Sequence, residues 1–199
     1  IKKQNYKSIL TSFGLNKSKP FAIMTYHPVT LEFSISQDAQ INNIFKAIND
    51  TDIQYLITLP GSEVGSTEMI KLIKKKILQN KDRMKLVDSI GFDRLYNLIP
   101  YSKYVIGNSS FGIIEVPYFK VPTINIGDRQ KGRFAHKSVI NTNYKSISIK
   151  KGIKRALDPK FLKNIKTMKY EFGNGNAADK IVDIISKVKI NQKLLRKVL

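Results

Sequence analysis

Residues 105–115 (Val-Ile-Gly-Asn-Ser-Ser-Phe-Gly-Ile-Ile-Glu) have the residue types of an anion-binding turn. Gly107 permits a tight turn after an apolar run, and Asn108, Ser109 and Ser110 are residue types that favour the start of a helix. Hydroxyls and free backbone N–H groups at a helix N-terminus suit a phosphate. The same residues also fit an ordinary capped helix, and both interpretations stay open.

Two further residues of this stretch could contact a nucleotide. Gly112 has no side chain, so it allows close approach of backbone or ligand. Glu115 lies about one helical turn beyond Ser110, where its carboxylate could accept hydrogen bonds from two ribose hydroxyls. The alternative is a surface glutamate on a capped helix.

A second glycine-flanked loop follows the next apolar run. Gly127 and Gly132 enclose Asp-Arg-Gln-Lys, and Arg133 follows directly. Arginine side chains such as Arg129 bind phosphate oxygens through two parallel hydrogen bonds, so this loop suits a polyphosphate. Taken alone it also fits a basic surface loop. Its place after a strand adjacent to the Ser109–Ser110 turn favours the phosphate interpretation.

His27 follows the first apolar run, where it could contact a phosphate or move a proton. A structural histidine is equally compatible, and we assign His136 that role. The loop at residues 61–67 follows a second strand and could cover a base or sugar. The chain has no GxGxxG or P-loop motif and no His/Asp/Glu cluster with metal-ligand spacing, so we expect neither cofactor nor metal.

The elements that must position these residues alternate between strands and helices. Short apolar runs predict buried parallel strands, and helical spacing of apolar residues predicts the helices between them. The predicted strands span residues 21–25, 53–58, 84–87, 104–106, 121–126 and 138–140. The predicted helices span residues 37–49, 69–78, 92–99, 110–116, 146–157, 159–165 and 177–188. This order predicts an α/β fold with a Rossmann-like, doubly wound parallel sheet whose ligand loops share one edge.

The composition excludes several classes of protein. The 199 residues include no cysteine, which excludes disulfides, thiolate metal sites and cysteine nucleophiles. No apolar run approaches the ~20 residues that span a bilayer. The first residues lack a signal-peptide pattern and do not begin with Met. We therefore expect a cytoplasmic chain that is a piece of a longer protein.

The net charge of +20 raises the alternative of a nucleic-acid-binding module. Of the 35 basic residues, however, only six are arginine, the residue that base readers and phosphate clamps use most. The lysines are spread along the chain, as expected for solvated faces. We therefore expect no nucleic-acid partner.

Four motifs together resemble the UDP-N-acetylglucosamine 2-epimerase family. They lie in the family's order at residues 25–30, 106–115, 121–133 and 173–177. The resemblance is nearest to the hydrolysing branch, which supplies N-acetylmannosamine for sialic acid synthesis. It runs from about Pro20 to Ser186 and covers the family's C-terminal half. It implies the C-terminal domain of a GT-B fold, in which two Rossmann-like domains hold a UDP-sugar between them.

The resemblance also implies roles for individual residues. The turn with Asn108 and Gly112 would bind UDP, with Ser109 and Ser110 on the diphosphate and Glu115 on the ribose. The loop around Ile90 would line the uracil. Arg129 and His27 would face the phosphates as the catalytic candidates, with His27 also near the reacting sugar. In the residue 61–67 loop this chain departs from the family, because many relatives carry Asn and Asp where it has Gly61 and Glu63.

The family reaction eliminates UDP across C1–C2 of the sugar, and water then adds with inversion at C2. Its proton-moving carboxylates lie mainly in the N-terminal domain, which this chain lacks. The implied organisation is a linker at residues 1–19, a UDP-binding domain at 20–186 and a basic tail at 187–199. The implied partners are the UDP-sugar, the N-terminal domain and, at full length, further copies in a homo-oligomer.

Three alternatives within sugar-nucleotide chemistry stay open. The first is an epimerase for a modified diacetamido UDP-sugar, and the second is a non-hydrolysing UDP-N-acetylglucosamine 2-epimerase. The third is a glycosyltransferase on the same fold. The absence of the Glu-x7-Glu pattern of common retaining glycosyltransferases disfavours the third.

Overall fold

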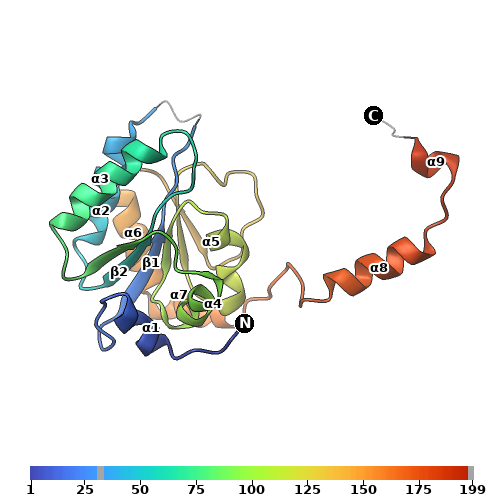
Figure 1. Cartoon of the computed structure of the whole chain (residues 1–199), viewed down its shortest axis with the longest axis horizontal. Helices are drawn as coiled ribbons and strands as arrows, with labels where there is room; N and C mark the ends of the chain where they lie inside the picture. The colour runs from blue at the N-terminus through green and yellow to red at the C-terminus, as the bar shows by residue number, and fades with distance from the viewer. Residues whose placement is uncertain (31–33, 197–199) are drawn as a thin grey trace. The chain divides into compact units, whose positions relative to one another are not determined.

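The computed structural model describes residues 1–30 and 34–196 (Figure 1). The chain divides into two compact units, Ile1–Lys169 and Tyr170–Leu199. The first unit contains the sheet and every residue proposed above for the site. The second unit contains the last two helices.

Six parallel strands form one sheet in the order β3-β2-β1-β4-β5-β6. The chain leaves β1 towards β2 on one side and returns to place β4 on the other, so the order reverses between β1 and β4. Ligands of doubly wound sheets bind at the carboxyl ends of the strands beside such a reversal. The strands are β1 (Phe21–Thr25), β2 (Gln54–Thr58), β3 (Met84–Val87), β4 (Val105–Gly107), β5 (Thr123–Ile126) and β6 (Val139–Thr142).

Helices connect the strands and cover the sheet. They are α2 (Gln37–Ile48), α3 (Ser66–Leu78), α4 (Phe92–Leu98), α5 (Phe111–Ile114), α6 (Ser146–Ala156) and α7 (Pro159–Lys166), with 3-10 turns η1 (Ile99–Tyr101) and η2 (Val116–Phe119). The predicted helix at 110–116 is shorter than expected. Pro117 has no backbone N–H to donate, so the chain changes into η2 instead of continuing α5.

Both faces of the sheet are buried, as the apolar strands predict. Successive residues of β1 alternate between two core clusters because strand side chains point to opposite faces. Ala22 and Met24 lie in the cluster that contains buried residues of α2, α3 and α6. Phe21 and Ile23 lie in the other. The predicted Rossmann-like α/β sheet is confirmed.

The N-terminal segment differs from the expected linker at residues 1–19. It forms α1 (Tyr6–Ser12), whose Ile9 and Leu10 are buried in the second core cluster. The backbone N–H of Asn16 donates to Oε1 of Gln54, 2.8 Å away, which joins the segment to β2. The apolar spacing that suggested one helical turn therefore produces a helix that packs on the sheet unit.

The second unit contains α8 (Ala177–Lys187) and α9 (Gln192–Leu195). No residue of α8 is buried, and its isoleucines at 181, 184 and 185 are more than half exposed. Residues 170–186, expected within the UDP-binding domain, thus belong to this separate unit together with most of the expected basic tail. The last three residues of that tail lie outside the described residues. None of the helices that the structure describes is long and apolar enough to cross a bilayer.

Candidate nucleotide-binding site

Asn108 joins the loops that follow β1 and β4, at the reversal of strand order. Its side-chain carbonyl accepts from the backbone N–H of His27 (2.7 Å), and its side-chain amide donates to the backbone carbonyl of His27 (2.8 Å). Asn108 is completely buried. Both hydrogen-bonding ends of the Asn108 side chain are thus used within the protein. The sequence suggested that Asn108 contacts the substrate directly, whereas in the structure its side chain holds the loop of His27 in position.

The backbone of Asn108 also holds the loop that follows β5. Its carbonyl accepts from Nη1 of Arg129 (3.2 Å) and from Nε2 of Gln130 (2.8 Å). We call this set of hydrogen bonds, to His27, Arg129 and Gln130, the Asn108 junction. It brings together the His27, Ser109–Ser110 and Arg129 segments that the sequence placed at one edge of the sheet.

Glu63 connects the two catalytic candidates. Its Oε1 lies 3.0 Å from Nδ1 of His27 and 3.6 Å from Nη2 of Arg129. The His27 contact is within ion-pair distance. Glu63 was missed as a site residue because its loop departs from the family pattern. Its position after β2, next to β1 in the sheet, was the signal that could have found it.

The environment of His27 lowers the pKa of its imidazole below the usual 6.5. Burial is the main cause, and the charge of Arg129 acts in the same direction, whereas the Glu63 carboxylate raises the pKa. The imidazole is therefore mostly neutral at pH 7. A neutral imidazole can accept a proton as the negative charge of a phosphate approaches.

Ser109 and Ser110 follow β4 and lead into α5. Ser110 occupies the N-cap position but makes no side-chain capping hydrogen bond, so its hydroxyl is not committed to the helix. Both serines are half-buried. With only four residues, α5 has a weak dipole, and the hydroxyls matter more than the helix itself for holding an anion.

Gly107 explains why the turn after β4 lies so close to β1. Its φ is +143°, and a Cβ atom built on it would lie 1.8 Å from the carbonyl oxygen of Thr25. Gly107 and Thr25 are paired in the sheet register. Only glycine fits this position, as the sequence indicated for a tight turn.

The remaining predicted residues occupy different environments. Glu115 is half-buried directly after α5, and burial raises the pKa of its carboxyl group. Gly112 does allow a close approach, but to β5: its carbonyl accepts from the Thr123 hydroxyl at 2.6 Å, and a Cβ would lie 2.9 Å from the Thr123 methyl. Ile90 is 4% exposed and packs in the core, so its side chain supports its loop from inside.

No set of three or more His, Cys, Asp and Glu residues with the geometry of a metal site occurs among residues 1–30 and 34–196. The Asn108 junction and its neighbours bring the guanidinium of Arg129 and the imidazole of His27 to this edge, both beside the Glu63 carboxylate. The hydroxyls of Ser109 and Ser110 belong to the loop between β4 and α5.

Comparison with known proteins places the chain in a family. Residues 1–186 match the sequence profile of the UDP-N-acetylglucosamine 2-epimerase family. The chain belongs to this family of enzymes. This match confirms the family named from the four sequence motifs.

Two relatives show the range of named activities within these epimerases. A Campylobacter jejuni protein named GDP/UDP-N,N'-diacetylbacillosamine 2-epimerase (hydrolyzing) is 32% identical over 69% of this chain and 36% of its own length. An Escherichia coli protein named polysialic acid biosynthesis protein P7 is 34% identical over 84% of this chain and 42% of its own length. The chain thus spans less than half the length of the relatives it matches.

Solved structures confirm the fold. The Staphylococcus aureus MnaA–UDP co-structure superposes with a TM-score of 0.69 at 18% identity, over 93% of this chain and 48% of that one. The Neisseria meningitidis UDP-GlcNAc 2-epimerase bound to UDP-GlcNAc gives 0.66 at 15% identity, over 92% and 48%. The expected fold, the Rossmann-like domain of a GT-B epimerase, is confirmed.

Proposed function

We propose that this chain is the UDP-binding, C-terminal half of a hydrolysing UDP-N-acetylglucosamine 2-epimerase. The reaction would convert UDP-N-acetylglucosamine and water to N-acetylmannosamine and UDP. The observation that carries the proposal is the Asn108 junction, which gathers His27, Arg129 and the Ser109–Ser110 turn at the reversal of strand order. The opposing catalytic half and a homo-oligomeric assembly belong to the same proposal.

In the proposed elimination, a base removes the proton on C2 while the bond from C1 to the diphosphate oxygen breaks. The electron pair of the C2–H bond forms the C1–C2 double bond, and UDP leaves with the electrons of the C1–O bond. Water then adds across the double bond with inversion at C2. The groups of this chain would act on the leaving diphosphate, where negative charge grows.

Arg129 would stabilise that charge because its guanidinium is always protonated. His27 would contact the same phosphates, and its lowered pKa keeps it able to take up a proton as they bind. The Ser109 and Ser110 hydroxyls would donate to the diphosphate, and Glu115 would accept from the ribose. The loop around Ile90, with Ile90 packed beneath it, would lie against the uracil.

The direct test is the product formed by the full-length protein. Incubation with UDP-N-acetylglucosamine, followed by proton NMR, should show N-acetylmannosamine and free UDP. UDP-N-acetylmannosamine without free UDP would instead assign the non-hydrolysing reaction. No consumption of any UDP-sugar would contradict an epimerase.

A second substrate has specific support. The 32%-identical Campylobacter relative is named for N,N'-diacetylbacillosamine, as is a Legionella pneumophila relative that is 24% identical over 93% of this chain. Faster conversion of UDP-N,N'-diacetylbacillosamine than of UDP-N-acetylglucosamine would favour this alternative. Both substrates require the same diphosphate and ribose contacts.

A further inference from the structure

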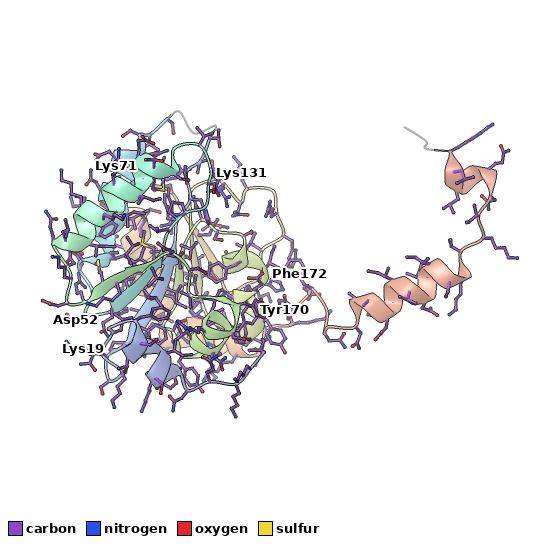
Figure 2. The ribbon with its side chains drawn as sticks, in the orientation of Figure 1. Lys19, Asp52, Lys71, Lys131, Tyr170 and Phe172 are labelled. Carbon is purple, nitrogen blue, oxygen red and sulfur yellow. The ribbon has the colours of Figure 1, made fainter. Side chains whose placement is uncertain are left out.

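The segment before α8 contains the one Asn-Gly pair of the sequence, Asn174 and Gly175. Figure 2 labels Tyr170 and Phe172 just ahead of the pair, and their rings pack edge to face with centroids 5.7 Å apart. The pair follows these aromatic residues and lies in the motif at residues 173–177. None of the roles proposed so far uses this part of the motif.

Both residues of the pair are open to solvent. Asn174 and Gly175 are exposed. A Cβ atom built on Gly173 or on Gly175 would meet nothing within 4 Å, so no other part of the chain covers the loop. The φ of Gly175 is +96°, a backbone conformation that glycine adopts at little cost. Water therefore reaches the Asn174 amide and the following peptide nitrogen.

No hydrogen bond holds the pair among residues 1–30 and 34–196. Neither the side-chain amide of Asn174 nor the backbone N–H of Gly175 has a recorded partner there. Asn108 is the opposite case, because it is completely buried and both ends of its side chain bond to His27. The Gly175 nitrogen can therefore approach the Asn174 amide carbon without breaking a protein contact.

These conditions favour a reaction between the two residues. The Gly175 nitrogen attacks Cγ of Asn174 and forms a new N–Cγ bond. The bond from Cγ to the side-chain nitrogen breaks, and that nitrogen leaves as ammonia with the proton of the Gly175 N–H. Water then opens the five-membered succinimide ring. Cleavage at Cγ gives aspartate, and cleavage at the main-chain carbonyl gives isoaspartate.

We propose that Asn174 is a modification site at which the chain deamidates spontaneously through a succinimide. Water is the only co-reactant, and no nucleotide takes part, so the inference does not depend on the proposed function. Either product adds one negative charge just before Ala177, where α8 begins. Isoaspartate also lengthens the backbone, because the chain then runs through the former side chain.

The experiment follows the chain during incubation at pH 7.4 and 37 °C. Cation-exchange chromatography separates the deamidated forms, and mass spectrometry of peptides with electron-transfer fragmentation distinguishes aspartate from isoaspartate. Asn176 is an internal control, because it is exposed but precedes Ala177, whose Cβ hinders attack by the peptide nitrogen. Both products should form at Asn174 about tenfold faster than at Asn176 or more. In water enriched in ¹⁸O, each product should carry a single heavy oxygen.

Two variants test the mechanism. Gly175→Ala should slow the reaction at least fivefold, since the added Cβ crowds the attacking nitrogen. Asn174→Gln keeps the amide but would require a six-membered ring, and it should abolish the products at this position. Unchanged rates in Gly175→Ala would overturn the proposal, as would aspartate without isoaspartate.

A synthetic peptide of residues 170–180 tests the structural part of the argument. It reports the rate of the same sequence without the rest of the protein. Because the loop is exposed and holds no hydrogen bond at the pair, the folded chain should react at a rate within about threefold of the peptide. A slower rate in the chain would show that the fold protects Asn174 and would overturn the inference, and so would equal rates at Asn174 and Asn176.

Discussion

One carboxylate, Glu63, sets the charge balance of the candidate site. It lies between His27 and Arg129, the two groups proposed to face the diphosphate. Without a nucleotide, Glu63 gives the guanidinium a counter-charge. A diphosphate has to share Arg129 with Glu63, and the mutual repulsion of these anions would then raise the proton affinity of the neighbouring His27.

Glu63→Gln should lower the pKa of His27 further. The carboxylate raises that pKa, while burial and Arg129 lower it, and the substitution removes only the raising contribution. NMR titration of the two histidine rings would measure the change, with His136 as the internal reference. An unchanged His27 pKa would mean that Glu63 does not interact with the ring in solution.

His27 should also make stability depend on pH. Its pKa is lower in the folded chain than the usual 6.5, so the unfolded chain binds the proton more readily. The contribution to folding is complete above about pH 6.5 and is lost as the pH falls from there through the folded-state pKa. Urea unfolding at pH 7.5 and 5.5 should show a smaller loss for His27→Gln than for the unsubstituted chain. Equal losses would exclude His27 as the cause.

Glu115→Gln should weaken UDP more than dUDP. A carboxylate accepts from both ribose hydroxyls, and hydrogen bonds to a charged group contribute about 1.5–3 kcal/mol, or roughly tenfold or more in Kd. The deoxy ligand lacks the 2′-hydroxyl, so it loses less. Calorimetry with both nucleotides measures the difference. Equal losses for the two nucleotides would show that Glu115 makes no contact with the 2′-hydroxyl.

At the scale of elements, the close pairing of β1 and β4 positions the site. The Asn108 junction depends on this pairing because Asn108 immediately follows β4 and His27 lies two residues after β1. Gly107 is the residue that permits it, since its missing Cβ leaves room for the Thr25 carbonyl. The relative positions of the site residues therefore depend on the carboxyl ends of β1 and β4.

Gly107→Ala should destabilise the fold by roughly 2–5 kcal/mol, because the methyl group meets backbone that cannot rotate away. Gly132→Ala is the matched control: its φ is +83°, but an added Cβ meets nothing within 4 Å. The control should lose only about 1–2 kcal/mol from backbone strain. Chemical unfolding of both variants provides the measurement. Similar losses of unfolding free energy in the two variants would show that the contact with the Thr25 carbonyl does not cause the destabilisation of Gly107→Ala.

The sequence predicted the central strands well because β1, β2, β4 and β5 are short, largely apolar runs that are buried on both faces. β1 and β3 match their predicted residues, and the shared edge of the loops followed from the parallel order. Glu63 and the buried packing of Gly112 could not be found this way. They depend on which side chains meet across neighbouring strands, and neither alternation nor helical spacing specifies such contacts. The packing of the N-terminal segment likewise depends on distant partners such as Gln54, which accepts from the backbone N–H of Asn16.

At the scale of the whole molecule, the chain spans 48% of the UDP-bound Staphylococcus structure that it matches. Under the proposed function, the groups of this chain would bind and neutralise a leaving diphosphate. The proposed reaction also needs a base at C2 of the sugar. The site described here is therefore one side of a larger catalytic arrangement under the proposed function.

The isolated chain should bind UDP weakly and turn over no UDP-sugar. The residues proposed for phosphate and ribose are present, but the opposing half that would close over the sugar is not. Calorimetry measures the binding, and a UDP-release assay measures the turnover. Sustained turnover by the isolated chain would contradict the proposal that catalysis requires the opposing half.

Salt dependence should separate UDP binding from attraction to polyanions. With a net charge of +20, non-specific binding to DNA or RNA should fall steeply between 50 and 200 mM salt. UDP binding at a defined site should fall only mildly over the same range. Fluorescence titrations with labelled oligonucleotide and calorimetry with UDP compare the two. Parallel steep losses would favour a charge-driven interaction for both.

The Asn108 junction leaves the side chain at position 27 open to substitution. The side chain of Asn108 bonds the peptide N–H and carbonyl of residue 27 and not its imidazole, so these two hydrogen bonds do not require a histidine there. A substitution there changes the reactive group and leaves its point of attachment in place. Single mutations at position 27 should therefore change the group that the loop presents and keep both of these hydrogen bonds.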